Sequence, residues 1–296
     1  MALLISVLEQ GLIYGIMALG MYITYKILDF PDMTVDGGFP FGVVLAVVMI
    51  RAGVAPILTL PICFLAGCLI GTITGFINVV FKVRDLLAGI IMMTALYSVN
   101  LRIAGRANLP MYDYYTIFDN KFLDSIFTNG PLSFLVSFRT VIVLLVIMIV
   151  VKVALDWYLN TKSGFMLRAV GDNDALVTSM GVNKGMVRIT GLAVANGLVA
   201  LSGSIYAQQQ GYFDVSMGTG TAVVGLASVI IGTSLLKKVS FFRVTTSVVI
   251  GSIIYKGCVA LAIKAGLQST DLKLVTAVLF LVILIVTMDK KKKVKG

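Results

Sequence analysis

Apolar stretches of about 20 residues recur along the whole of this chain, and no other feature constrains its fold as strongly. This is the length at which an α-helix crosses the hydrocarbon core of a bilayer. The stretches are continuously apolar and do not alternate, which argues against a transmembrane barrel. Only 13% of the residues are charged, against roughly 25% in soluble domains. We therefore predict an all-α polytopic membrane protein with no separate soluble domain.

The pattern predicts about nine transmembrane helices, within a range of eight to ten. The candidate spans are 4–26, 38–52, 55–81, 86–104, 134–158, 186–208, 218–236, 242–264 and 272–288. Two of them, 38–52 and 218–236, are predicted to be short. We predict that these two are discontinuous segments.

The net charge of +10 reflects membrane topology and not nucleic-acid binding. A run of lysines closes the sequence, and cytoplasmic segments are the ones enriched in Lys and Arg. With this run inside, three other basic groups fall on the same side: Lys82 with Arg84, the segment 160–187, and Lys237 and Lys238 with Arg243. The N-terminus and segment 105–132 then lie outside. Five basic residues are also placed outside, which weakens the excess of positive charge on the inside: Arg51, Arg102, Arg106, Lys121 and Arg139.

The outside segment 105–132 mixes Tyr and Phe with polar residues. Aromatic side chains of this kind suit the membrane interface, where a short helix can lie flat. The same segment also suits the landing of an external partner. The sequence leaves both interpretations open.

A weak internal repeat links the two short segments. Asp32-Met-Thr-Val-Asp-Gly-Gly38 resembles Asp214-Val-Ser-Met-Gly-Thr-Gly220, and a Gly-Leu pair opens the span before each. On the topology above the two copies enter from opposite sides, so the repeat is inverted. Paired, glycine-interrupted segments at matching places point to a transport site, because broken helices free backbone groups that a cavity must satisfy. The alternative is a chance match between two small motifs.

Catalytic and cofactor-binding patterns are missing from the sequence. The nearest approach to a phosphate-binding loop, Gly232 to Lys237, lacks its second glycine. The chain has no histidine, and its three cysteines all lie in apolar segments, where packing is their usual role. We expect neither an enzyme nor a metal site, and no cofactor in this chain.

Ionisable residues inside the spans each need a reason, since each costs about 2.5–3.5 kcal/mol at the bilayer centre. Glu9 and Lys256 either line a pathway or pair across helices, and Lys256 has the further option of snorkelling outward beside Lys264. Lys152 and Asp156 are one helical turn apart, which predicts an i,i+4 ion pair.

Uncharged polar residues gather in two regions of the apolar sequence. They are Asn78, Thr94, Tyr97, Ser98 and Asn100 in the third and fourth spans, and Asn196, Ser202, Ser204, Gln208, Gln209 and Gln210 in the sixth. Such side chains either hold helices together or line a path for a polar solute.

The inside segment 161–188 is predicted to form a helix end, a turn, a short helix and a second turn. Gly164 and Gly171 permit tight turns, and Asp172 or Asn173 can cap the short helix. Gly181 is placed to end it. A helix this short is marginal in water, so we expect it to dock against a partner.

This segment reads G-x-x-L-R-A-V-G-D-N-D-A followed by M-G-V-N, and it resembles the cytoplasmic loop of ABC importer permeases of the branched-chain amino-acid and ribose type. The resemblance extends through residues 11–42, 191–211 and 218–232, and a departure is Leu176, where the family often has a small residue. It implies a coupling helix that fits the ATPase subunit. The implied ATPase-coupling residues are Gly164, Arg168, Ala169, Gly171, Asp172, Asn173, Ala175, Gly181 and Asn183.

The resemblance implies a single transmembrane permease domain over 1–296, with halves near 1–160 and 186–288, a coupling loop at 160–187 and an external loop at 105–132. The expected partners are a cytoplasmic ATPase dimer that carries ATP and Mg, an external solute-binding lipoprotein, a second copy in a homodimer, and lipid of a bacterial plasma membrane. The TVDGGFP motif resembles permeases paired with lipoproteins for aromatic amino acids. The predicted pathway residues are Asp36, Gly37, Gly38, Asn100, Asn196, Gln208, Gly218 and Gly220.

Two other functions compete with this prediction. An ion-coupled secondary transporter also uses inverted repeats and would need Glu9, or Asp36 with Asp214, as an ion site. A non-transporting anchor or receptor would tolerate apolar replacements at 94–100 and 196–210.

Overall fold

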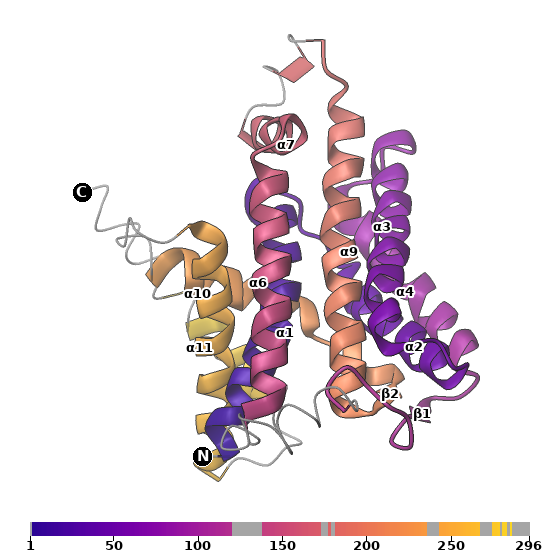
Figure 1. Cartoon of the computed structure of the whole chain (residues 1–296). Coiled ribbons are helices and arrows are strands. Elements are labelled where there is room, and N and C mark those ends of the chain that lie inside the picture. The colour runs from indigo at the N-terminus through magenta and orange to yellow at the C-terminus, as the bar shows by residue number, and fades with distance from the viewer. Residues whose placement is uncertain are drawn as a thin grey trace.

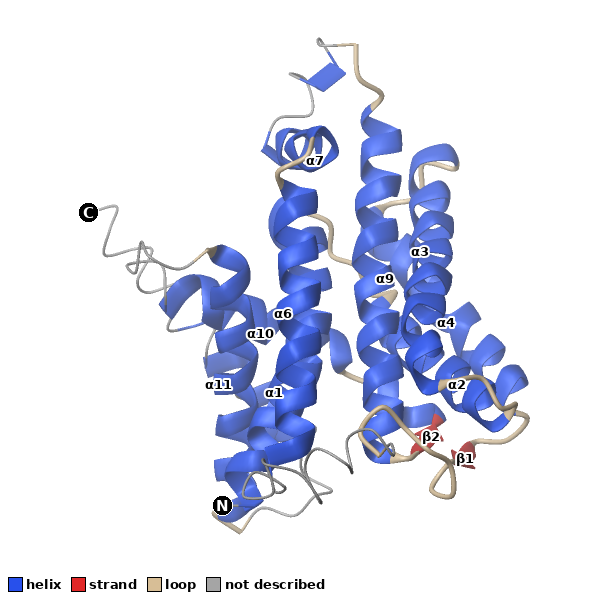
Figure 2. Cartoon of the chain, viewed as in Figure 1, coloured by secondary structure: helices blue, strands red, loops and turns tan. Residues whose placement is uncertain are grey.

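The computed structural model describes residues 2–119, 138–172, 177–178, 181–235, 243–266, 274–278, 280–282 and 285. These residues are helical apart from loops and one two-stranded ribbon (Figures 1 and 2). Seven of the described helices are long and apolar enough to cross a membrane. The structure therefore confirms the all-α polytopic class.

The first half comprises α1 (Ala2–Met21), the π-helix η1 (Tyr22–Ile27), α2 (Val35–Arg51), α3 (Pro56–Val80) and α4 (Asp85–Ala104). Strand β1 (Asn108–Pro110), α6 (Arg139–Leu159) and α7 (Lys162–Asp172) follow. The second half comprises α9 (Lys184–Gln210), strand β2 (Tyr212–Asp214), the 3-10 helix η3 (Val215–Gly218), α10 (Thr221–Leu235) and α11 (Val244–Lys264).

Eight of the nine predicted spans fall on these helices, and the ninth, 272–288, is described only at residues 274–278, 280–282 and 285, which are helical. Helix α2 has 17 residues and α10 has 15. Each begins after a segment that is not α-helical, at residues 28–34 and 211–220 respectively. Both discontinuous segments are therefore present as predicted.

Helices α1 and α9 lie antiparallel at the centre of the bundle (Figure 1). Ser202 of α9 donates a hydrogen bond to the carbonyl oxygen of Ile13 at 2.7 Å, and both groups are buried. Seven positions further along α1 and seven back along α9, Gly20 lies against the carbonyl of Ala195. Small residues and hydroxyl groups of this kind let membrane helices approach closely. Helix α3 packs on α9, and α11 packs on α1.

The same contacts occur in both halves. A shift of 182 positions, the separation of Asp32 and Asp214, converts the α3–α9 contacts into α11–α1 contacts. Gly67 against Gly197 becomes Val249 against Gly15, Gly71 against Ala193 becomes Ile253 against Gly11, and Gly75 against Ile189 becomes Gly257 against Val7. Since α1 and α9 run in opposite directions, these contacts confirm the inverted repeat.

The segments before α2 and α10 also share their backbone geometry. The Asp32 carboxylate accepts a hydrogen bond from the Thr34 N–H at 2.9 Å, and the Asp214 carboxylate accepts one from the Ser216 N–H at 2.8 Å. Three residues before each aspartate the backbone is left-handed, with φ of 53° at Asp29 and 75° at Gly211. Two matching Asx turns behind matching left-handed residues exclude a chance resemblance.

The repeat supplies a matched pair for a test of helix packing. A Cβ at Gly75 would lie 2.9 Å from the backbone of Ile189, whereas at Gly257 the nearest atom is 3.8 Å away. We expect Gly75→Ala to lower the free energy of unfolding by about 1–3 kcal/mol through overpacking. Gly257→Ala should be neutral or should gain up to about 1 kcal/mol from helix propensity. Thermal unfolding of both variants in detergent measures this, and equal melting shifts would contradict it.

Candidate functional site

The two discontinuous segments meet where α2 and α10 begin. The Asp36 carboxylate, in the first turn of α2, accepts hydrogen bonds from Gly220 N–H at 3.1 Å, the Thr221 hydroxyl at 2.9 Å and Ala222 N–H at 2.7 Å. Gly218 lies against the Asp36 carbonyl with no room for a side chain. A carboxylate satisfies the free N–H groups of a helix start and complements its dipole. Asp36 therefore joins the two halves at equivalent positions, since residues 36 and 218 are 182 apart.

Two asparagines from other helices reach the place where the two segments meet, which we call the crossing. Asn100 of α4 donates a hydrogen bond to the Gly37 carbonyl at 3.1 Å. The Asn196 side-chain oxygen would lie 3.4 Å from a Cβ at Gly38. Among the described residues, the side-chain oxygens of Asn100 and Asn196 are buried without a hydrogen-bond partner. Buried acceptors are normally satisfied, so two such oxygens at one place are unusual.

A buried hydrogen-bonded chain holds the first segment in place. Asn196 donates to the Asp32 carboxylate at 2.8 Å, and the hydroxyls of Thr34 and Thr74 are 3.2 Å apart. Asp32 has only 2% of its surface exposed. Asp32 was not among the site residues predicted from the sequence, although its place as the first residue of the repeated motif was the available signal.

Seven of the eight predicted pathway residues thus gather at the crossing, and Gln208 does not. Its side chain accepts a hydrogen bond from the Ile117 N–H at 2.9 Å and donates to the Thr59 hydroxyl at 3.0 Å and the Pro56 carbonyl at 3.2 Å. Gln208 therefore fastens the end of α9 to the start of α3 and to the segment after β1.

The prediction of tight turns at Gly164 and Gly171 is wrong, because both residues lie inside α7. A Cβ at Gly164 would overlap the backbone of Leu159, and one at Gly171 would overlap the carbonyl oxygen of Ile27 at the end of η1. The two glycines permit close contact and not a change of chain direction. Helix α7 is therefore seated on the end of α6 and on the π-helical end of α1.

The remaining coupling positions divide between turns and an exposed face. Gly181 has φ of 74°, and bonds from Gly181 N–H to the Thr178 carbonyl and from Val182 N–H to the Val177 carbonyl complete a Schellman motif. The predicted helix stop is confirmed. Asn183 caps α9 by accepting from Gly185 N–H at 2.9 Å. Asn173 and Ala175 lie outside the described residues.

One face of α7 is exposed in the described part of the chain. Arg168 and Asp172 are exposed, Phe165 is 57% exposed, and Ala169 is half-buried against the core. Phe165 was absent from the sequence prediction, and its signal was an apolar residue three positions before Arg168 on a polar helix. An exposed aromatic beside charges is typical of a protein interface.

The predicted ion pair of Lys152 and Asp156 is confirmed at 2.9 Å. Asp156 also binds Arg243 at 3.3 Å and accepts a hydrogen bond from the Thr245 hydroxyl at 2.7 Å. This buried carboxylate therefore ties the end of α6 nearest α7 to the start of α11.

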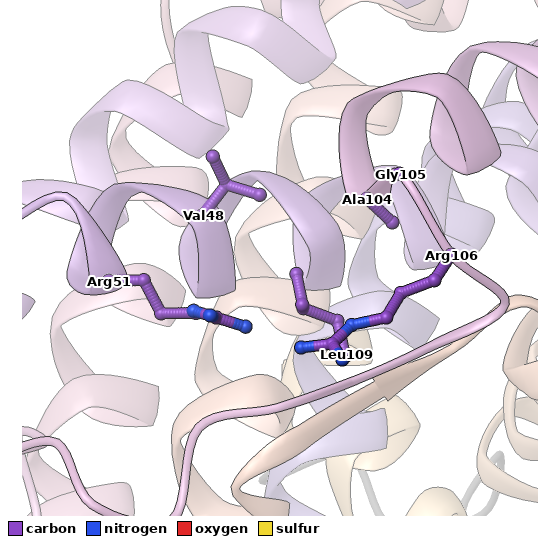
Figure 3. Close-up of a pocket in the computed structure, with 6 residues that line it drawn as sticks. All are labelled: Val48, Arg51, Ala104, Gly105, Arg106 and Leu109. Carbon is purple, nitrogen blue, oxygen red and sulfur yellow. The ribbon is translucent and has the colours of Figure 1, made fainter.

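The opposite end of the bundle carries the β1–β2 ribbon and a basic cleft. Residues 105–119 form β1 and turns, so a surface helix is wrong for this part of 105–132, and 120–132 lie outside the described residues. The cleft has a volume of about 400 Å³, and the guanidinium groups of Arg51 and Arg106 point toward each other across it (Figure 3). Arg51 also donates to the Pro110 carbonyl at 3.5 Å.

An inverted repeat of membrane helices with two broken segments meeting at a polar crossing defines a transport permease. The model of the family described as the branched-chain amino acid transport system permease component matches residues 3–287. The chain belongs to this family, whose members are transport subunits of ABC systems and not enzymes.

Curated relatives agree with the family. The chain is 42% identical to the tyrosine transport system permease protein of Clostridioides difficile, over 95% of this chain and 90% of that one. It is 33% identical to an uncharacterized protein of Rickettsia prowazekii, over 95% and 96%. It is 25% identical to the ribose import permease protein RbsC of Haemophilus influenzae, over 79% and 69%. No solved structure gives a significant match.

Proposed function

We propose that this chain moves a small solute, an amino acid and in particular an aromatic one, into the cell, using ATP hydrolysed with Mg on a separate ATPase dimer. The similarity to a tyrosine transport permease supports the solute class. The contact of α7 with η1 is the main support for coupling to an ATPase, because it joins a helix that a partner can reach to the first broken segment.

The contacts from α7 to the crossing form a continuous path. Gly171 touches Ile27 and Leu28 at the end of η1, and the left-handed Asp29 follows directly. Asp32, three residues on, is bonded to Asn196 of the central helix α9. π-helices are frequent at functional sites. A push on α7 from the ATPase would therefore reach the segment that leads into α2, as a rigid-body change would require.

The outer face of α4 supports a homodimer. Thr94, Tyr97 and Ser98 are exposed in the middle of this span, and Tyr97 is 54% exposed. Polar side chains inside a membrane normally face protein or a water-filled cavity. A second copy of the chain would cover this face and enclose a polar path beside Asn100, which makes the functional unit a homodimer.

The proposed orientation in a bacterial plasma membrane follows from the two ends. Helix α7 and the C-terminus lie in the cytoplasm, whereas the start of α1 and the β1–β2 ribbon face outward. The cluster of Arg51 and Arg106 at that outer end complements an acidic surface on the external solute-binding lipoprotein.

Co-purification tests the coupling role of α7. An ATP-hydrolysing subunit should accompany the purified chain, and Phe165→Glu should reduce its recovery about tenfold or more, as loss of an interface hot spot does. Tyr115→Glu is the matched control, since Tyr115 is a 67% exposed aromatic at the opposite end of the molecule. Absence of any nucleotide-binding companion would overturn the proposal.

The ion-coupled alternative is weakened by the state of its carboxylates. Asp36 accepts three hydrogen bonds from α10. The Ser216 hydroxyl holds the pKa of Asp214 below its usual value, so this group stays ionised and does not carry a proton near neutral pH. Uptake by vesicles holding this chain alone, driven by an ion gradient, would support the alternative. The anchor or receptor alternative requires unchanged uptake after apolar replacement of Thr94, Ser98 and Asn196.

A further inference from the structure

Lys256 lies on the inward face of α11, although it is charged. It follows Val249 and Ser252 on the same helical face, and both of these are buried. Its ammonium group sits 3.5 Å from the centroid of the Tyr14 ring. The side chain therefore points into the bundle and does not snorkel beside the exposed Lys264.

The ring under this ammonium belongs to an aromatic cluster contributed by three helices. Tyr14 of α1 stacks on Phe39 of α2 with centroids 5.5 Å apart, and Tyr206 of α9 lies 5.8 Å from Tyr14 and 5.3 Å from Phe39. Phe39 follows Gly38 directly. The cluster is therefore continuous with the crossing of the two broken segments.

No carboxylate of the described residues lies within ion-pair distance of Lys256. Glu9, the only glutamate in the chain, accepts a hydrogen bond from Gln209 at 3.0 Å. Asp36 and Asp214 are bonded to the start of α10 and to Ser216. A charged side chain inside a membrane that is paired with no other charge is a functional-site candidate.

The internal repeat shows what is unusual about this position. The shift of 182 places Lys256 where the first half has Thr74, and it relates Tyr14 to Asn196. Thr74 and Asn196 are the two ends of the hydrogen-bonded chain that runs from Asn196 through Asp32 and Thr34 to Thr74. In that chain the carboxylate and the hydroxyls bond to one another. At the equivalent positions Lys256 instead lies over the ring of Tyr14.

The geometry points to Lys256 as the group that receives the solute's carboxylate, with Tyr14, Phe39 and Tyr206 contacting its aromatic part. This assignment rests on the proposed function and specifies its binding site. A carboxylate forms a charge-assisted hydrogen bond with an ammonium, which is stronger than the contact with a ring. The solute therefore replaces the Tyr14 ring as the partner of Lys256, and an amine without a carboxylate does not.

The first test uses the purified permease in detergent, without ATPase or binding protein. The probes are 3-(4-hydroxyphenyl)propionate, which has the ring and the carboxylate, and tyramine, which has the ring and an amine. The propionate should raise the melting temperature of the wild type and of Lys264→Met, and tyramine should not. In Lys256→Met the apparent Kd for the propionate should rise about tenfold to a hundredfold. Equal stabilisation by both probes, no effect of the propionate on the wild type, or an unchanged Kd in Lys256→Met would overturn the assignment.

The second test measures labelled L-tyrosine uptake by the complete complex in proteoliposomes. Lys256→Met should lose about tenfold or more of the uptake while basal ATP hydrolysis continues, and Lys256→Arg should retain most of it. Normal uptake by Lys256→Met would overturn this assignment and leave the proposed function intact. A wild-type chain that supports no ATP-dependent uptake would instead count against the proposed function, and the detergent test would still decide on Lys256.

Discussion

Replacing Gly171 with alanine is expected to reduce solute uptake by at least tenfold while ATP hydrolysis by the partner subunit continues. A Cβ at this position would overlap the carbonyl oxygen of Ile27, so α7 must move away from η1. Overpacking of this kind costs about 1–3 kcal/mol, which corresponds to roughly tenfold to a hundredfold in an equilibrium. The exposed face with Phe165 and Arg168 is unchanged, so the ATPase still binds. Uptake and phosphate release from the same proteoliposomes measure the two effects.

Gly257→Ala is the control for this variant, because it makes the same substitution in a membrane helix that has room for a methyl group. It should transport at the wild-type rate. Wild-type uptake in Gly171→Ala would show that the contact with Ile27 does not transmit the motion. Loss of the ATPase from the Gly171→Ala complex would show that Gly171 shapes the docking face itself.

Replacing Asp36 with alanine is expected to lower the free energy of unfolding by about 2–4 kcal/mol and to abolish uptake. The substitution leaves Gly220 N–H, Ala222 N–H and the Thr221 hydroxyl without their acceptor. Loss of a helix cap costs about 0.5–2 kcal/mol, and hydrogen bonds to a charged group contribute about 1.5–3 kcal/mol. Thermal and denaturant unfolding in detergent measure the stability, and proteoliposomes measure the uptake.

Asp214→Asn is the comparison, since the half-buried Asp214 bonds to Ser216 in its own turn and to Asn108 of the neighbouring strand β1, at the end of the molecule that carries the ribbon. Its loss of stability should stay below about 1 kcal/mol, as for a surface turn. Equal losses for Asp36→Ala and Asp214→Asn would contradict the role of Asp36 as the link between halves. A stable Asp36→Asn protein that loses only ion-driven uptake would favour the secondary transporter.

The local pattern of the sequence was sufficient for the fold class, the spans and the repeat. Continuous apolar runs predicted the helices because lipid leaves a helix as the main way to satisfy the backbone. The motif from Asp32 to Gly38 and its copy from Asp214 predicted the two broken segments, because an Asx turn needs only residues adjacent in sequence. Five of the predicted pathway residues come from this motif, and they lie at the crossing with Asn100 and Asn196 from the polar clusters. Their role in a pathway stays a prediction.

Errors arose where one residue type serves two physical purposes. Gly164 and Gly171 were predicted as turns because glycine adopts left-handed backbone easily, yet both sit in α7 for their lack of a side chain. Gln208 was predicted in the pathway because amides suit polar solutes; its amide is bonded to Thr59 and Ile117, and its role in a pathway stays a prediction. The contacts of Gly171 and Gln208 depend on neighbours that are far away in sequence, whereas Gly164 meets Leu159 five positions before it.

The sequence by itself therefore determined that this chain is a membrane protein with several spans and two related halves. Each of these properties depends on residues that are near neighbours in the chain. The tertiary structure alone decided that Asp36 caps the helix of the other half, that α7 is seated on η1, and that Lys256 faces Tyr14. These contacts join residues more than a hundred positions apart. Their partners are fixed by the antiparallel packing of α1 and α9, which brings the halves together at the membrane centre.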